Sequence, residues 1–247
     1  MKKSFAGFAL AGALALSAQA DLLGFGAGAG LWSATPSGSA DYGQSFDIKS
    51  DTGLSSSNNG YLWAYLEHPV LFLPNIRIER TGFESDGTKA TNITFGGETF
   101  NVGDTKTELT LNQIDTILYY GLPVPAIDIN LGFGTKSFDG ELSMTSPLTS
   151  ESADLSFVLP VLYAGMRFEI PGIPVGLEAD IKYIGYDESK FSDTRIKADW
   201  AFIDSGIAVA AELGYRQQAL VIKDLSGADA EADITIDGLF AGLSARF

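Results

Sequence analysis

Several stretches of the chain alternate between apolar residues and polar or very small ones with a period of two. The clearest lie at 23–31, 127–134, 175–184 and 207–216. Successive side chains of a β-strand point to opposite faces, so each stretch has one apolar face and one polar or nearly bare face. The pattern predicts an all-β protein. The ten expected strands cover about 22–35, 60–68, 75–83, 107–121, 126–138, 153–170, 174–186, 192–203, 207–222 and 232–247.

The segments between these strands alternate in length. Short ones at 69–74, 122–125, 171–173 and 204–206 take turns with longer polar ones at 36–59, 84–106, 139–152, 187–191 and 223–231. This asymmetry is typical of outer-membrane β-barrels, whose periplasmic turns are short and whose external loops are longer. Residues 92–102, in the second long loop, are a candidate for an extra hairpin.

A soluble β-sandwich or lipocalin-like barrel would alternate in the same way, with the apolar face buried. The aromatic residues of the apolar face favour a membrane barrel, because they form two bands near opposite strand ends, as at two lipid–water interfaces. One band holds Phe133, Tyr183 and Tyr215, and the other holds Tyr120, Phe168, Trp200, Phe202 and Phe247. We therefore expect one antiparallel transmembrane β-barrel of about ten strands. Eight remain the alternative if two strands are extramembrane extensions.

The first twenty residues have the features of a secretory signal peptide. Lys2 and Lys3 precede an uncharged apolar stretch at 4–16, and Ala18-Gln19-Ala20 supplies a small-x-small cleavage site. We expect cleavage after Ala20, which leaves residues 21–247 as one barrel domain exported to the outer membrane. No later stretch reaches the eighteen or so uninterrupted apolar residues that a transmembrane helix needs.

The last ten residues, GLFAGLSARF, form an alternating strand that ends in an aromatic residue. Phe247, with Gly242 five positions earlier, resembles the signal by which outer-membrane proteins are recognised for insertion. Ala245 and Phe240 depart from that pattern, which has another aromatic and a polar residue at those positions.

Longer segments at 47–79, 159–172 and 237–247 resemble a family of small, largely uncharacterised proteobacterial outer-membrane β-barrel proteins. The likeness is most specific from Glu67-His68-Pro69 to Pro74-Asn75. It implies a Gram-negative outer-membrane barrel and brings no known catalytic or ligand-binding residue. The expected partners are outer-membrane lipid, lipopolysaccharide, periplasmic chaperones and the barrel-assembly machinery, with the chain as a monomer.

The face opposite the apolar one carries many charged residues and is expected to line the lumen. They are Arg77, Arg167, Lys182, Arg195, Lys197, Arg216 and Arg246 against Glu79, Asp115, Asp128, Glu169, Glu178, Asp180, Asp193, Asp199 and Glu212. An unpaired buried charge costs several kcal/mol, so we expect ion pairs across neighbouring strands. Barrels of about eight strands are filled by side chains, while open channels appear at about sixteen. The charges are interpreted as a structural network, with a narrow pathway for small ions or solutes as the alternative.

Three aromatic residues share the lumenal face with Glu67. Tyr61, Trp63 and Tyr65 are expected to point inward near the outer mouth. Filling the lumen is their ordinary role, and binding of a ring-shaped or apolar solute is the alternative.

The composition narrows the possible functions. The chain has 16 Lys+Arg against 31 Asp+Glu and a net charge of −15, which argues against nucleic-acid binding. With no cysteine, disulfides, a thiol nucleophile and cysteine-ligated metals are excluded. The one histidine, His68, opens a short turn, far from any external serine. No enzyme activity, cofactor or metal site is expected.

Two functions remain open. The first is a structural or surface-interaction barrel with a plugged lumen, whose acidic loops are solvated or bridge divalent cations to lipopolysaccharide. The second is a narrow passive channel, which its acidic loops would make cation-preferring.

Overall fold

A computed structural model describes residues 23–223 and 230–247, and it is an antiparallel β-barrel. The predicted signal peptide lies outside the described residues. The ten wall strands are β1 (Gly24–Tyr42), β3 (Ser57–Glu67), β4 (Asn75–Ala90), β7 (Asp104–Leu122), β8 (Asp128–Thr145), β10 (Phe157–Glu169), β11 (Val175–Tyr186), β12 (Ser189–Asp204), β13 (Ala208–Ile222) and β14 (Ala230–Arg246). The remaining strands are short: β2 (Ser45–Asp47), β5 (Ile93–Phe95), β6 (Glu98–Phe100) and β9 (Ser150–Asp154).

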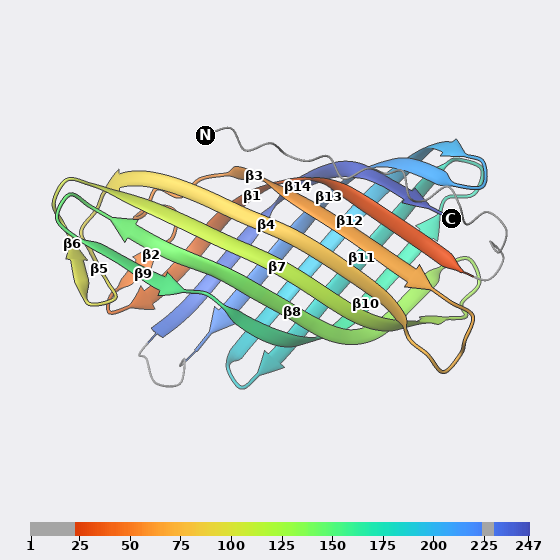
Figure 1. The fold of residues 1–247 in the computed structure, drawn as a ribbon, viewed down its shortest axis with the longest axis horizontal. Coiled ribbons are helices and arrows are strands. Elements are labelled where there is room, and N and C mark those ends of the chain that lie inside the picture. The colour runs from red at the N-terminus through yellow and green to blue at the C-terminus, as the bar shows by residue number, and fades with distance from the viewer. Residues whose placement is uncertain (1–22, 224–229) are drawn as a thin grey trace.

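The barrel closes because the first and last strands pair. β1 and β14 are in register from Gly26 opposite Arg246 to Tyr42 opposite Ala230. Every other wall strand pairs with its neighbours along the chain, which confirms the ten-strand prediction over the eight-strand one. Figure 1 shows both ends of this closed sheet at the same end of the barrel, with the short turns. We call this the periplasmic end and the opposite one the external end.

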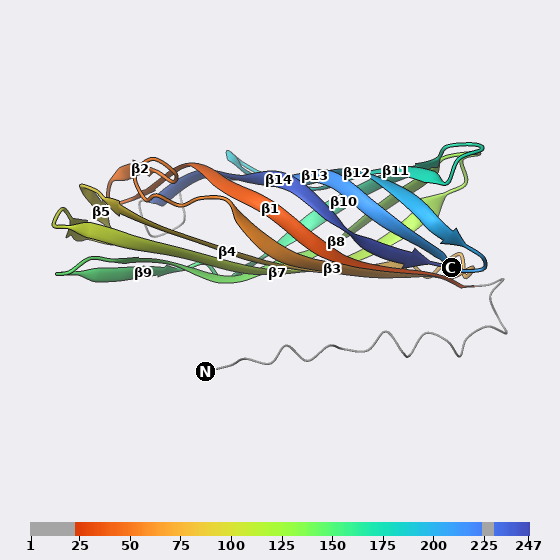
Figure 2. The ribbon, with the colours of Figure 1, turned by 90° about the horizontal axis from the view of Figure 1, so that it is seen from above.

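The external end is more ordered than the sequence predicted (Figure 2). Strands β1, β4, β7 and β8 all run on into the segments expected to be loops. The candidate hairpin at 92–102 is confirmed as β5–β6. The expected strand at 153–170 is divided into β9 and β10, and the expected long loop at 187–191 is a two-residue turn. Asp187 has a φ of 54° there, a left-handed conformation that asparagine and aspartate tolerate best among non-glycine residues.

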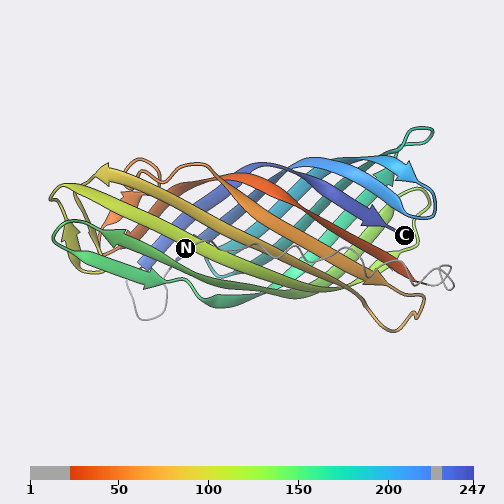
Figure 3. The same ribbon diagram turned by 45° about the horizontal axis from the view of Figure 1, so that its top comes forward.

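The wall carries its apolar side chains on the outside and its charged side chains on the inside, which is the reverse of a soluble protein. Leu31, Leu162, Ile196, Leu213 and Leu239 are exposed on the outside, whereas most charged strand residues are buried inside. Burial of ions beneath an exposed apolar surface is unfavourable in water and favourable in lipid. The exposed face is therefore a lipid-facing belt around the strands seen in Figure 3. No helix among the described residues is long and apolar enough to cross a membrane.

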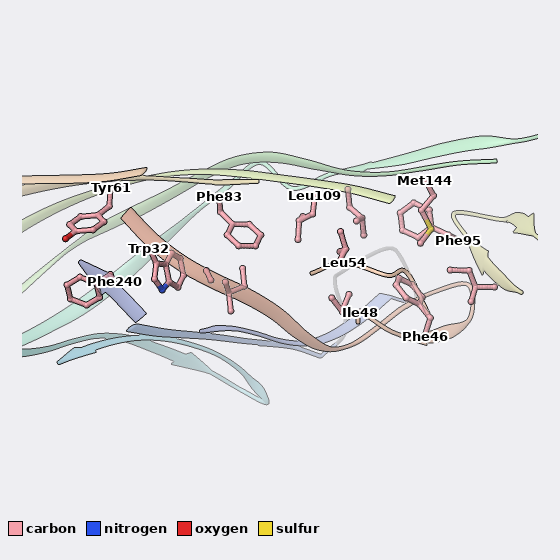
Figure 4. Packing of buried hydrophobic residues seen from close by; sticks show 14 of the residues in the cluster. Trp32, Phe46, Ile48, Leu54, Tyr61, Phe83, Phe95, Leu109, Met144 and Phe240 are labelled. Carbon is pink, nitrogen blue, oxygen red and sulfur yellow. The ribbon is translucent and has the colours of Figure 1, made fainter. Parts of the chain in front are cut away.

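Buried apolar side chains fill the external half of the interior, and we call them the apolar cluster. Trp32 and Phe83 are fully buried, and the segment after β2 contributes Ile48 and Leu54. Figure 4 shows these side chains meeting along the barrel axis, from Tyr61 and Phe240 to Phe46 and Phe95. The external half of the interior therefore contains a continuous cluster of packed apolar side chains.

The glycines of β1 make room for the aromatic residues of β3. A Cβ at Gly28 would lie 2.6 Å from Trp63 Cε2, and one at Gly26 would lie 2.4 Å from Tyr65 Cε1. The two strands are paired with these residues opposite each other. The glycines that alternate along β1 therefore leave the space that the aromatic rings of β3 occupy inside the barrel.

Candidate functional site

The middle of the lumen holds a compact set of charged residues. The basic and acidic members that are almost inaccessible to solvent are Arg77, Lys136, Lys182, Arg195, Lys197 and Arg216, and Glu79, Asp115, Asp180, Asp193, Asp199 and Glu212. Their formal charges cancel. A neutral, paired set is the arrangement in which buried ions cost least. We call these twelve residues the lumenal network.

Glu79 on β4 is a central acceptor of this network. Lys182 Nζ on β11 lies 2.6 Å from Glu79 Oε2, and Arg195 Nη2 on β12 lies 2.9 Å from Glu79 Oε1. Arg195 also contacts Asp180, on the neighbouring strand, at 2.8 Å. Strands β7, β8 and β10 separate β4 from β11 around the wall. The expectation of pairing across neighbouring strands was therefore too narrow, because this barrel is slim enough for opposite walls to pair directly.

Lys136 was missed by the sequence reasoning and is a fully buried lysine of the network. Its ammonium lies 2.8 Å from Asp115 Oδ1 and 3.2 Å from Asp193 Oδ2. Asp193 also accepts two bonds from Arg216, from Nε at 2.9 Å and from Nη2 at 2.6 Å. Lys136 lies eight positions after Asp128, on the same side of the alternation, so the signal was present in the sequence.

A pair of glutamines extends the contact between opposite walls. Gln113 on β7 and Gln218 on β13 exchange side-chain hydrogen bonds at 3.0 and 2.7 Å. Gln218 also donates to Asp193 Oδ2 at 3.0 Å. Both amides are buried, so they occupy space that water would fill in an open channel.

A second cluster surrounds Glu212 on β13. Tyr61 Oη donates to Glu212 Oε1 at 2.7 Å, and Lys197 Nζ lies 2.9 Å from Oε2. Trp63 lies beneath the cations, with its ring centre 4.6 Å from Lys197 Nζ and 5.1 Å from Arg77 Cζ. Cation–π contacts of this kind stabilise cations that have lost water. Tyr61 and Trp63 do point inward, as expected, and they fill the lumen.

The periplasmic end contains an open, charged cavity of about 270 Å³. Arg167 and Arg246 share Asp199, with contacts of 2.5 and 3.3 Å, and both also reach Glu178. Tyr65 lines this cavity, which corrects its expected place at the outer mouth, because β3 runs from the external end towards the periplasmic end.

Two of the predicted lumenal carboxylates lie at the rim of this cavity rather than inside. Asp128 is exposed at the start of β8, and Glu169 is exposed at the end of β10, where it accepts a bond from Arg167. Strand ends leave the lumen, so residues of the correct alternation can still face water there.

The lumenal network and the apolar cluster are in contact with each other at Trp32. Arg216 lies over the Trp32 ring, with Cζ 5.0 Å from its centre. The cavity between Trp32, Tyr61, Arg195, Arg216 and Phe240 has a volume of about 10 Å³. That is room for about one water molecule at most.

His68 stabilises a turn. Its Nδ1 accepts a bond from Val70 N–H at 3.3 Å, and its Nε2 lies 3.1 Å from Pro74 O. The side chain of Asn75 accepts a bond from His68 N–H at 3.0 Å, which closes the same turn. Among the described residues no group of three or more His, Cys, Asp or Glu side chains is placed to hold a metal ion.

The two residues of the predicted insertion signal lie at the closing seam. Phe247 exchanges two backbone hydrogen bonds of 2.9 Å with Phe25, and the two rings are 5.6 Å apart. A Cβ at Gly242 would lie 2.4 Å from Tyr61 Oη. Both positions therefore have packing roles beyond any role in recognition.

Comparisons with known proteins support the fold. No protein-family model and no curated protein matches the sequence. Among solved structures, the outer membrane protease OmpT from Escherichia coli matches at 12% identity, over 91% of this chain and 96% of that one, with a TM-score of 0.51. The translocator domain of the autotransporter NalP from Neisseria meningitidis matches at 13% identity over 94% and 91%, with a TM-score of 0.44. The attachment invasion locus protein Ail of Yersinia pestis matches at 10% identity over 92% and 99%, with a TM-score of 0.36.

The likeness to OmpT shows the fold alone, because so few residues are shared. It agrees with the closed antiparallel sheet of this chain. The chain has the fold of an outer-membrane β-barrel.

Proposed function

We propose that this chain is a plugged outer-membrane barrel that does not conduct and that serves a structural or surface-interaction role through its extended external end. The observation that carries the proposal is the double closure of the lumen. The lumenal network joins opposite walls in the middle, and the apolar cluster fills the external half.

Energetics support a permanent closure. Opening a path would separate buried ion pairs such as Lys182–Glu79 and leave each charge without its partner. Breaking one buried pair typically costs about 3–5 kcal/mol. A conducting state would require several such breaks together with displacement of Trp32 and Phe83.

Planar-bilayer recordings of the purified, refolded chain test the proposal. We expect no reproducible conductance steps, in contrast to a general porin inserted under the same conditions. Arg195→Ala, which removes the cation that pairs with Asp180, and Asp180→Asn, which leaves Arg195 paired with Glu79 alone, should also stay silent as long as the apolar cluster is intact.

Reproducible steps in the wild type would contradict the proposal. If those steps shrank on neutralising Arg195 or Asp180, and if cations were preferred, the narrow channel would be the better function. Its supporting feature is the charged periplasmic cavity, which reaches Arg77 and Glu178.

A further inference from the structure

The wall of the barrel is split between β3 and β4 towards the external end. Their ladder ends at Tyr61 opposite Thr81, although both strands continue beyond that pair. From there β3 stays paired with β1, and β4 stays paired with β7. The edges that face each other across the split have no strand partner among the described residues. Such unpaired edges are normally covered or blunted.

Two side-chain bonds close the split again farther out. Asn59 Oδ1 accepts a bond from Glu84 N–H at 2.8 Å, and Ser85 Oγ donates to Ser55 O at 2.8 Å. The split is therefore a bounded opening in the wall, and not a strand end fraying into solvent.

A hollow of about 700 Å³ lies at this opening, and we call it the β3–β4 notch. Its lining includes Ala29 and Leu62 on the apolar side and Glu84, Asp86 and Glu108 on the polar side. Gly60 leaves it unfilled, because a Cβ there would meet no atom within 4 Å.

Arg80 lies in this notch with apolar neighbours on both sides. Leu62 and Ile114 are its partners in the two adjacent strands, and they are 49% and 50% exposed on the lipid-facing surface. Arg80 makes no ion pair within the part of the chain that the structure describes, in contrast to the lumenal arginines. Glu84, Asp86 and Glu108 line the same hollow but form no ion pair with Arg80, so its guanidinium is available to an anionic ligand.

The height of Arg80 along the wall indicates what that partner is. Ile78, two positions towards the periplasmic end, faces lipid, and Glu84 and Asp86, towards the external end, are exposed and charged. Arg80 thus marks the boundary between acyl chains and headgroups on the external side. Guanidinium groups bind phosphate in paired hydrogen bonds, and carboxylates accept hydrogen bonds from hydroxyl groups.

We propose that the β3–β4 notch binds a phosphorylated glycolipid of the outer leaflet, of the lipid A type. Its phosphate contacts Arg80, an acyl chain lies on Ala29 and Leu62, and sugar hydroxyls donate to Glu84 and Asp86. The three acidic residues favour a glycolipid over a plain anionic phospholipid, which has fewer hydroxyls to offer. This site does not depend on whether the lumen conducts, so the two proposals fail independently.

Native mass spectrometry of the full chain in detergent micelles, titrated with monophosphoryl lipid A, tests the site. We expect one bound lipid, and an affinity loss of roughly tenfold to a hundredfold in Arg80→Ala, as for the loss of a charged hydrogen bond. Gly60→Phe, which adds a ring at a position where a Cβ would meet no atom within 4 Å, should weaken binding at least as much. The matched controls Lys190→Ala and Leu213→Phe change a cation and an outward side chain on β12 and β13, and should bind as the wild type does.

Three results would overturn the assignment. The first is unchanged binding in Arg80→Ala and Gly60→Phe, or equal loss in the two controls. The second is equal affinity for phosphatidylglycerol or for dephosphorylated lipid A. The third is displacement of the lipid by an equal concentration of inorganic phosphate, which would indicate a phosphate site and not a lipid site. If Gly60→Phe fails to fold, Arg80→Lys decides, since it should bind more tightly than Arg80→Ala.

Discussion

At the scale of single residues, the lumen shows how a membrane barrel tolerates many charges. Lys136 is fully buried, yet Asp115 and Asp193 lie within 3.2 Å of its ammonium, so its charge is balanced at short range. Buried pairs contribute little net stability when intact, but removal of one partner is strongly destabilising.

Replacement of Lys136 by methionine should therefore destabilise the barrel by about 3–5 kcal/mol, because two carboxylates lose their shared cation. The measurement is urea-induced unfolding of the refolded protein in lipid vesicles. Lys106→Met is the control, since its pair with Glu108 is half exposed and worth about 0–1 kcal/mol. Equal losses of stability in the two variants would show that the buried lumenal ion pairs matter no more to the stability of the barrel than an exposed pair does.

Asp47 gives a pH-dependent prediction outside the membrane. The backbone N–H groups of Ser50 and Lys49 donate to its carboxylate at 2.6 and 2.9 Å, and these bonds hold the pKa of Asp47 below its usual value of 3.8. A lowered pKa means that the folded loop is favoured above pH 3.8 and loses this contribution as the pH falls through the lower, folded-state pKa.

An NMR titration of the Asp47 carboxyl group should show this lowered pKa, and amide exchange of Ser50 should speed up only at the acid end. Asp47→Asn keeps an acceptor oxygen without the charge, so exchange at Ser50 should then no longer follow this titration. A pKa at or above 3.8 in the wild type would disprove the loop geometry.

At the scale of elements, β1 and β3 pack together because β1 has glycines at the inward positions where β3 has aromatic residues. The inward positions of β1 are glycines where the inward positions of β3 are Tyr61, Trp63 and Tyr65. The rings use the space left by the missing side chains, and this places Tyr61 and Trp63 against Glu212.

Gly28→Ala tests this fit, because the added methyl group would lie 2.6 Å from the Trp63 ring. We expect a loss of about 1–3 kcal/mol in urea unfolding, the usual cost of overpacking. Gly60→Ala is a matched glycine substitution with open space around its Cβ, and it should leave stability nearly unchanged. A reversed order would mean that the rings do not rest on β1.

At the scale of the whole molecule, closure of the sheet depends on the β1–β14 seam. Phe247 extends that seam through its backbone bonds with Phe25 and through ring contact. The residue that resembles an insertion signal is therefore also the last contact that closes the barrel at the periplasmic end.

Phe247→Ala should lower the fraction of the chain that reaches the membrane as a folded, heat-modifiable barrel. Gel mobility of unheated and heated membrane samples measures that fraction. Phe202→Ala removes another exposed aromatic near the periplasmic end and controls for lost interfacial anchoring. An equal loss in both variants would argue against a special role of the closing residue.

The sequence by itself determined the barrel, its ten strands and the sides on which residues lie. Alternation is a local property of a strand, so Arg77, Glu79 and Lys182 could be assigned to one face without knowledge of their neighbours. The same rule applied to Lys136, which was overlooked although its position obeyed it. The external extensions were missed because their outer face is polar, and the apolar contrast that marks a lipid-facing strand ends there.

Only the tertiary structure decided which residues meet across the lumen and where the wall opens. The contacts of Glu79 with Lys182 and Arg195 depend on barrel diameter and strand stagger, which belong to the closed sheet as a whole. The split between β3 and β4 depends on how far each ladder continues, and no single strand carries that information. The local alternation thus determines whether a side chain points into the lumen or towards lipid, whereas closure of the sheet determines which side chain it contacts across the lumen.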